Sequence, residues 1–388
     1  MDQEDFMLLK KCCFVIDRDF INIHHGCRRY LFGMSKIFSS LGFESDFLML
    51  SKGSFECINF SEQDKKNNGY NDNTCVGRTK DEILLRLKKE PKIVYEAPSI
   101  DISCVTEIEK RNNKQYDICV LGGPWIFDKA EDLPLANKYF CVAHDIVPNR
   151  NYFSEPNNFG LLMFAYAHAK GYKYFSTYGN GLITTTNTVA EQLVEYGFAG
   201  KNQVFTMPLF LPVGYDEEIA FTNRRRNGVV LAAPFDIRKG MDVIPSILND
   251  ANVDKLYIFG RPRCDLANLI EWFESLKLTN VEWWVDVNLA KQQELYSSAK
   301  VLLFPSYQEG LGLPILEATA CGTSPLVRNK NPMNQLVPDQ MNIANDNSEF
   351  VERLSYLLSD DIDFAKKNIK YSERYKVSNL DMSWLMRL

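Results

Sequence analysis

Short apolar runs recur along the chain and alternate with amphipathic stretches, a pattern that predicts strands alternating with helices. The run KCCFVI at 11–16 precedes a helical pattern over about 27–41 and a second apolar run at 44–50. Apolar runs joined by crossover helices are typical of parallel sheets, so we expect an α/β chain. The later runs lie at 116–121, 139–143, 182–186, 229–233, 255–259, 281–285 and 301–304.

Two stretches interrupt this pattern. Residues 53–79 are polar and rich in Asn, which predicts a surface insertion or mobile loop. Residues 206–226 contain two prolines and end in a run of three arginines, which indicates a domain boundary and hinge. A length of 388 residues is typical of two domains.

Composition excludes several classes of protein. The formal net charge is −6, which argues against binding nucleic acid through phosphate neutralisation. The ten cysteines form no CxxC pair and the chain has only four histidines, so we expect no metal framework and a reducing cytoplasm. The acidic start MDQEDFMLLKK differs from a signal peptide, and no apolar stretch approaches the roughly 20 residues needed to span a bilayer.

The most informative segment is FPSYQEGLGLPILEATACG, residues 304–322. Glu309 and Glu317 lie eight residues apart, around a Gly-rich loop that follows an apolar run. Pro314 suits the first turn of a helix that begins after this loop. A helix start directs backbone N–H groups at an anion such as a phosphate, and carboxylates can accept hydrogen bonds from sugar hydroxyls. The alternative is an ordinary strand–turn–helix with solvated glutamates.

Polar residues also follow three other apolar runs, where strands of an open α/β sheet end and ligands bind. His144 and Asp145 begin HDIVP, Arg238 and Lys239 lie in FDIRKG, and Arg261 lies in FGRP. The alternatives are that His144 caps a strand, that Asp145 starts a turn, and that the basic residues are solvated. Cations in such loops can neutralise the charge of a diphosphate leaving group without a metal.

These motifs resemble glycosyltransferase family 4. Glu309 and Glu317 match its signature of two glutamates within an EGFGLPxLEAMAxG-like pattern. HDIVP is similar to the HD(L/I)xP segment of bacterial members, many of them mannosyltransferases that act on polysaccharides such as O-antigen, and 184–188 resembles their ITVSE-S segment. The segment 235–240 resembles GRLxxxKG, with Lys239 on the family lysine. Pro234 replaces the family arginine, whose contact is then missing or supplied by Arg238 or Arg261.

The resemblance implies the GT-B fold, an α/β architecture of two Rossmann-like doubly wound domains facing a central cleft. Residues 1–210 would form the acceptor-binding domain and 211–365 the nucleotide-sugar-binding domain. Residues 366–388 would form a helix that crosses back to the first domain. The resemblance is weak before residue 140 and covers His144 to Val327 well.

The resemblance also implies a function. We expect a retaining hexosyltransferase that uses a nucleotide-diphosphate sugar and a saccharide or lipid-linked saccharide acceptor in surface polysaccharide synthesis. Neither a metal cofactor nor nucleic acid is expected. The expected location is cytoplasmic, with peripheral contact at the inner face of the plasma membrane or with other assembly enzymes. The alternatives are an inactive GT-B scaffold subunit and a nucleotide-sugar epimerase of the same fold.

The implied roles divide between catalysis and donor binding. His144 would orient the sugar, Asp145 would lie near the acceptor, and Glu317 would hold the ribose. His24 and His25 would contact the acceptor or be only loop residues, and the backbone at Gly26 would approach the donor phosphate. The expected catalytic residues are His144, Asp145, Lys239 and Glu309. The expected donor-binding residues are Gly26, Arg238, Lys239, Gly260, Arg261, Glu309, Gly310, Leu311, Gly312, Leu313 and Glu317.

Overall fold

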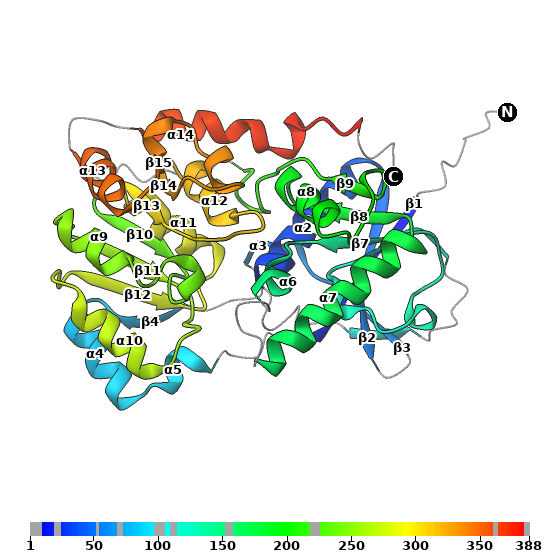
Figure 1. Cartoon of the computed structure of the whole chain (residues 1–388), viewed down its shortest axis with the longest axis horizontal. Helices are drawn as coiled ribbons and strands as arrows, with labels where there is room; N and C mark the ends of the chain where they lie inside the picture. Colours follow the sequence, from blue (N-terminus) through cyan, green and yellow to red (C-terminus); the bar gives the residue numbers. More distant parts are fainter. Residues whose placement is uncertain are drawn as a thin grey trace. The chain divides into compact units, whose positions relative to one another are not determined.

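A computed structural model gives the fold of the chain as two compact α/β units (Figure 1). The first unit takes the described residues within 1–65, 101–209 and 381–388, and the second those within 66–100 and 210–380. The structure describes residues 10–18, 25–51, 54–67, 73–96, 105–108, 115–151, 158–217, 226–359 and 364–383.

The sheet of the first unit has, among the described residues, eight strands in the order β5-β3-β2-β1-β6-β7-β8-β9. All neighbouring strands are parallel except that β3 runs antiparallel to both β2 and β5. The strands are β1 Lys10–Ile16, β2 Phe43–Ser51, β3 Ser54–Ile58, β5 Val105–Ile108, β6 Tyr116–Leu121, β7 Ala136–Ala143, β8 Gly181–Thr184 and β9 Val204–Thr206. The α-helices are α2 His25–Ser40, α3 Glu62–Asn67, α6 Val147–Asn151, α7 Phe159–Thr177 and α8 Asn187–Glu195.

The sheet of the second unit has, within the described ranges, seven strands in the order β15-β14-β13-β10-β11-β12-β4. Only β4 is antiparallel to its neighbour. The strands are β4 Thr74–Gly77, β10 Val229–Ala232, β11 Leu256–Phe259, β12 Val281–Val285, β13 Val301–Phe304, β14 Ser324–Arg328 and β15 Ile343–Ala344. The α-helices are α4 Lys80–Lys89, α5 Lys92–Tyr95, α9 Ile244–Asp250, α10 Leu266–Ser275, α11 Leu289–Ser298, α12 Leu313–Ala320, α13 Asn347–Leu358 and α14 Ala365–Ser372.

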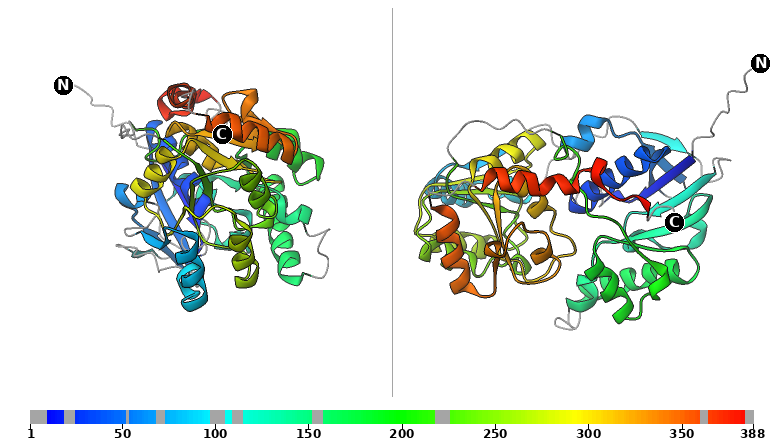
Figure 2. Two further views of the ribbon diagram at one scale, coloured as in Figure 1. Left: turned by 90° about the vertical axis from the view of Figure 1, so that its left-hand side faces the viewer. Right: turned by 90° about the horizontal axis from the view of Figure 1, so that it is seen from above.

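The core of the second unit explains its apolar runs. The strands β10 and β13 are buried along their whole length, as expected for central parallel strands covered on both faces. Helices α4, α9, α10 and α13 contribute to one apolar core that also contains the fully buried Trp283 of β12. Helix α14, drawn in red in Figure 2, packs on α12, where buried Asn368 donates to the carbonyl of Gly322 over 3.2 Å.

The prediction of a surface loop at 53–79 is wrong for most of this stretch. This stretch contains β3 of the first sheet, α3, and β4 at the edge of the second sheet. The described part of 66–100 therefore belongs to the second unit, whereas the sequence had placed it in the first domain (Figure 1). The edge pairing of β4 joins residues about 200 positions apart, which no local pattern reveals.

Most other elements lie where they were predicted. The two doubly wound α/β sheets are confirmed, and the division between the units after residue 209 falls inside the predicted stretch 206–226, although residues 218–225 lie outside the described ones. The central cleft and the crossing of residues 366–388 to the first domain stay predictions. Among the described residues, no helix is long and apolar enough to cross a membrane.

Candidate functional site

The predicted motifs of the second unit lie together at the carboxyl ends of the central strands of its sheet. Strand β10 pairs with β11 on one side and with β13 on the other, so the order of strands reverses at β10. Ligands of open α/β sheets bind outside the carboxyl ends of the strands at such a reversal. The loop 233–240 follows β10, the loop 260–265 follows β11, and the loop 305–312 follows β13.

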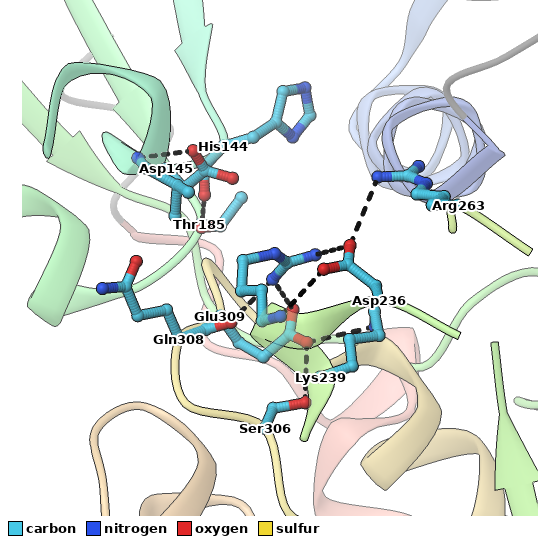
Figure 3. A network of polar contacts seen from close by, with 11 residues as sticks. His144, Asp145, Thr185, Asp236, Lys239, Arg263, Ser306, Gln308 and Glu309 are labelled. Atoms are coloured by element: carbon cyan, nitrogen blue, oxygen red, sulfur yellow. Dashed lines mark hydrogen bonds and ion pairs between the residues drawn. The ribbon is translucent and has the colours of Figure 1, made fainter. Parts of the chain in front are cut away.

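Glu309 is the centre of the polar network in these loops (Figure 3). Its carboxylate lies 3.1 Å from Nζ of Lys239 and 3.2 Å from Nη1 of Arg238. Oγ of Ser306 donates to Oε1 of Glu309 over 3.1 Å. The side chain of Glu309 is only 11% exposed, so these interactions are weakly screened by solvent. The structure therefore brings together three of the predicted site residues.

The pKa of Glu309 reflects two opposing effects. Burial raises the pKa of this carboxyl, but the charges of Lys239 and Arg238 and their hydrogen bonds outweigh burial. The net result is a pKa below the usual value, so Glu309 is ionised at neutral pH. A carboxylate held in this state accepts hydrogen bonds and donates none.

The turn that carries the two cations is held by capping interactions. Oδ1 of Asp236 accepts from the backbone N–H of Arg238 over 2.9 Å, and Gly240 ends the turn with φ of 81°. A Cβ atom on Gly240 would lie 2.8 Å from the carbonyl oxygen of Pro305, so this position requires glycine. Nη1 of Arg238 also donates to the carbonyl of Gln308 over 2.6 Å. These contacts fix the turn against the loop 305–312.

The Gly-rich loop ends at the start of α12, as predicted. Gly312 is the residue before the helix and has φ of 91°, a left-handed conformation that favours glycine. Leu313 and Pro314 form the first turn, and Gly310 and Leu311 precede it. The helix start, with its N–H groups and positive dipole end, therefore lies in the loop that also holds Glu309.

Glu317 lies in a different environment from Glu309. It is fully buried in α12, with 0% of its surface exposed. Tyr296 donates from its hydroxyl to Oε2 of Glu317 over 3.0 Å, and Gln292 donates from Nε2 to the same oxygen over 3.4 Å. Both partners belong to α11, so Glu317 ties α11 to α12. Its predicted contact with a ribose stays a prediction.

Arg261 makes structural contacts in the loop after β11. Its guanidinium pairs with both carboxylate oxygens of Asp286, and its Nε lies 2.7 Å from Oδ1. Its Nη1 donates to the carbonyl of Ile93 in α5 over 3.1 Å. Gly260 donates its backbone N–H to the carbonyl of Trp284 over 2.9 Å. The predicted donor contacts of Gly260 and Arg261 are untested by these interactions.

In the first unit, His144 follows β7. Its Nε2 lies 2.8 Å from the carbonyl oxygen of Gly122, and because a carbonyl only accepts, Nε2 carries the proton of the neutral ring. Nδ1 is therefore the acceptor atom of neutral His144. Its ring packs edge-on against Tyr30 with centroids 5.6 Å apart. The structure fixes both the tautomer and the orientation of the side chain.

Asp145 caps the short helix that follows. Its Oδ1 accepts from the backbone N–H of Val147 over 2.9 Å, as the turn interpretation predicts. Thr185 donates from Oγ1 to the carbonyl of His144 over 3.1 Å, and Thr186 caps α8 by accepting from Val189 over 3.2 Å. The segment that resembles ITVSE-S therefore lies beside His144. A role of Asp145 toward an acceptor stays a prediction.

Gly26 lies in the first turn of α2, exposed to solvent. A Cβ atom there would have nothing within 4 Å, so packing does not require glycine. Its contact with a donor phosphate stays a prediction. His24 lies outside the described residues.

The sequence analysis missed several residues of these networks. Ser306 and Asp236 contact the cluster of Glu309, and Gln292 and Tyr296 contact Glu317. The pattern Asp236–Gly240, an Asp followed by a short basic turn and Gly, is a capping signal that sequence could have given. The pairing of Glu317 with α11 depends on tertiary packing and has no local signal.

Comparisons with known proteins agree with the geometry of the second unit. Residues 228–375 match the family model of glycosyl transferases group 1. O-antigen biosynthesis glycosyltransferase WclY of Escherichia coli is 32% identical over 132 residues, 34% of this chain and 35% of that protein. O-antigen chain mannosyltransferase B of Escherichia coli is 40% identical over 53 residues, 14% of each. These alignments thus span about a third or less of either curated relative.

Solved structures extend the likeness to the whole chain. Sucrose-phosphate synthase from Thermosynechococcus elongatus superposes with a TM-score of 0.59 at 14% identity, covering 97% of each chain. WaaG, a glycosyltransferase involved in lipopolysaccharide biosynthesis, has a TM-score of 0.55 at 14% identity and also covers 97% of each chain. Identities this low show the fold alone. The chain therefore has the GT-B fold, and residues 228–375 of its second unit are similar to glycosyl transferases group 1.

Proposed function

We propose that this protein is a retaining glycosyltransferase that moves a hexose from a nucleotide-diphosphate sugar to a saccharide or lipid-linked saccharide in surface polysaccharide synthesis. The observation that carries the proposal is the cluster of Glu309, Lys239 and Arg238. It lies where the order of strands reverses, beside the start of α12. The carboxylate suits the sugar hydroxyls of such a donor, and the two cations suit its diphosphate.

The two cations would act on the leaving group. A diphosphate leaves with developing negative charge, and Lys239 and Arg238 would stabilise that charge without a metal ion. Both residues pair with Glu309 in the structure, so a diphosphate would compete with this carboxylate for them. Glu309, thus released from one or both cations, would accept hydrogen bonds from the sugar hydroxyls. The amides of 310–313 would bind the β-phosphate.

Arg238 is the best candidate for the cationic contact that Pro234 cannot make. Its guanidinium lies in the cluster with Glu309, whereas that of Arg261 pairs with Asp286. The second unit therefore keeps two cations in the loop after β10. This arrangement favours a working enzyme over an inactive scaffold subunit.

Transfer with retention would proceed on one face of the sugar. The bond from the anomeric carbon to the diphosphate oxygen breaks, the acceptor oxygen bonds to the same face, and the proton of the acceptor hydroxyl passes to the leaving phosphate. No side chain acts as a nucleophile. His144, held by Gly122, would orient the sugar from the first unit.

The similar proteins support the substrate classes. Two relatives are O-antigen enzymes, one of them a mannosyltransferase. HepE of Anabaena, with a TM-score of 0.57 at 11% identity over 97% of each chain, was crystallised in complex with UDP and glucose. A nucleotide hexose and a saccharide acceptor are the corresponding proposal for this chain. Peripheral contact with a membrane or with other assembly enzymes belongs to the same proposal.

The experiment is a transfer assay with a panel of UDP-, GDP-, ADP- and dTDP-hexoses and lipid-linked saccharide acceptors. We expect one donor to be consumed, a product whose new linkage keeps the donor's anomeric configuration by NMR, and full activity in EDTA. Loss of activity in EDTA that Mg²⁺ or Mn²⁺ restores would contradict the metal-free account. A scaffold subunit would transfer nothing, and an epimerase would convert the donor without an acceptor.

The variant His144→Ala tests the contribution of the first unit. We expect nucleotide binding by calorimetry to be unchanged and the transfer rate to fall by about 10²-fold, the scale of one positioned polar group lost from a site. Transfer at the normal rate would assign the contribution of this unit to another residue.

A further inference from the structure

Residues 73–96 are an integral part of the second unit. Strand β4 pairs with β12 and closes the edge of the sheet, and Ile83, Leu87 and Val94 are completely buried in the core with Trp283. Nζ of Lys80 donates to the carbonyl of Leu276 over 2.6 Å. Burial of these apolar side chains stabilises the packing of the segment on the second unit.

Helix α5, at the end of this segment, contacts the loop 260–265. The carbonyl of Ile93 accepts from Nη1 of Arg261 over 3.1 Å. The hydroxyl of Tyr95 donates to the carbonyl of Cys264 over 3.1 Å. One hydrogen bond near each end of the loop, at Arg261 and at Cys264, thus joins the loop to α5.

The same loop contacts the turn that carries the two cations. The backbone N–H of Arg263 donates to the carbonyl of Phe235 over 2.9 Å, and its Nη1 lies 4.0 Å from Oδ2 of Asp236 (Figure 3). Asp236 in turn caps the turn through the N–H of Arg238. A continuous series of contacts therefore runs from α5 through the loop 260–265 to the cluster of Glu309.

Arg261 is suited to holding this loop. Its Nε and both terminal nitrogens contact Asp286 or Ile93, and the side chain is 18% exposed. Asp286 is almost fully buried, and its backbone has φ of 54°, a conformation that residues other than glycine rarely adopt. Removing Arg261 would leave a buried carboxylate uncompensated, so this pair is part of the fold of the loop.

We propose that α5 and Arg261 are a positioning element of the donor site, which holds the loop 260–265 and through it the turn 236–240. The inference rests on the proposed function, because it assumes that the turn binds the donor diphosphate. In this proposal Tyr95 and Arg261 act by holding the loop and not by contact with the donor. Weakening the contacts of these two residues makes the loop more mobile. Donor binding then includes the entropy cost of ordering the loop, so the affinity for the donor falls.

The test is Tyr95→Phe, which removes only the hydroxyl of a 40% exposed side chain. We expect faster hydrogen exchange at the amides of 260–265. We also expect the affinity for UDP, GDP, ADP or dTDP, whichever the wild type binds, to be weaker by about threefold to tenfold, the scale of one hydrogen bond. We expect KM for the donor to rise in proportion, while kcat and the melting temperature stay unchanged.

The matched control is Tyr257→Phe. It removes a hydroxyl that donates to Asn227 over 3.0 Å near the amino ends of β10 and β11, away from the loops that follow these strands. We expect it to leave exchange at 260–265, affinity and KM unchanged. Arg261→Gln should weaken binding of the same nucleotide in the same way as Tyr95→Phe, and the double variant should be less than additive, because both act on one loop.

Several outcomes would overturn the inference. Exchange at 260–265 and nucleotide affinity that both equal the wild type would show that α5 does not hold the loop. Faster exchange with unchanged affinity would show that the loop does not position the donor, and a lower melting temperature without a change in KM would assign Tyr95 to stability alone. A wild type that binds none of UDP, GDP, ADP and dTDP would instead refute the proposed function, and exchange would still report whether α5 holds the loop.

Discussion

Glu309 and Glu317 come from one motif, eight residues apart, yet they occupy opposite environments. Glu309 lies in the loop before α12, between two cations and the hydroxyl of Ser306. Glu317 lies on the helix itself, fully buried, and accepts from Tyr296 and Gln292 of α11.

The difference shows that position relative to the helix start decides what a carboxylate of this motif can do. A residue before the first turn shares the loop with the N–H groups of the helix and with the cations of the neighbouring turn. A residue on the second turn faces whichever element packs on the helix, here α11. The first glutamate therefore lies beside two cations and a helix start, whereas the visible partners of the second are structural.

The largest effect should come from Glu309→Gln. The variant keeps the size of the side chain but removes the charge that the proposal assigns to the sugar hydroxyls. We expect kcat for transfer to fall by about 10²–10³-fold, as when one preorganised polar group is lost, with a small change in melting temperature.

A matched control is Glu294→Gln, the same substitution at a half-exposed glutamate that pairs with Lys291 over 3.1 Å. Ion pairs at the surface contribute little to the free energy of unfolding, so we expect kcat and the melting temperature of Glu294→Gln to be close to those of the wild type. Normal turnover in Glu309→Gln would mean that the loop carboxylate is structural as well, and the contrast between the two glutamates would disappear.

The next effect should come from Glu317→Ala, which leaves the hydroxyl of Tyr296 without its acceptor inside the core. Losing a buried hydrogen-bonded carboxylate should destabilise the protein by about 2–4 kcal/mol, measured by denaturant or thermal unfolding. If Glu317 also holds the ribose, the affinity for a nucleoside diphosphate should fall in calorimetry.

Tyr296→Phe separates the two roles of Glu317. It removes the structural donor but leaves the carboxylate, so we expect a smaller loss of stability and unchanged nucleotide affinity. Unchanged nucleotide affinity in a folded Glu317→Gln protein would reject the ribose contact and leave Glu317 with its structural role alone.

A smaller effect is expected for Lys239→Met, because Arg238 remains beside the diphosphate. The charge on a leaving group grows toward the transition state, so loss of Lys239 should lower kcat by about 10–10²-fold and weaken donor binding less. Equal losses in kcat/KM and in donor affinity would show that Lys239 stabilises the ground state and the transition state equally. Wild-type turnover in Lys239→Met would mean that the segment 235–240 is only a surface turn.

The fold was predictable from sequence wherever a strand is a continuous apolar run. The runs at 229–233 and 301–304 became the central strands β10 and β13, since both faces of such strands are covered by helices. Strand β4, Thr74–Gly77, has only four residues inside a polar stretch. Its partner β12 follows about 200 residues later, so only tertiary structure shows the pairing.

The candidate site was predictable as a set of loops but not as a set of contacts. Loops after parallel strands meet at one edge, which is why Lys239, Arg238 and Glu309 come together. Sequence could not show that Arg261 pairs with Asp286, because that carboxylate follows another strand. It could not show the burial of Glu317 either, because α11 supplies its partners.

The smallest expected effect concerns pH. The pKa of Glu309 lies below its usual value of 4.5 because Lys239 and Arg238 outweigh the effect of burial. The unfolded chain therefore binds a proton at a higher pH than the folded chain does. By linkage, the stabilisation from Glu309 is fully present above about pH 4.5 and is lost as pH falls through the lower, folded-state pKa.

The measurement compares the melting temperatures of the wild type and Glu309→Gln from pH 8 down to pH 3.5. A protonated Glu309 resembles glutamine in charge, so the difference between the two proteins should be constant above about pH 5 and shrink below pH 4.5. The control Glu294→Gln should show little difference at any pH. A difference for Glu309→Gln that grows on acidification would require a folded-state pKa above 4.5, and the two cations would then not dominate the environment of this carboxylate.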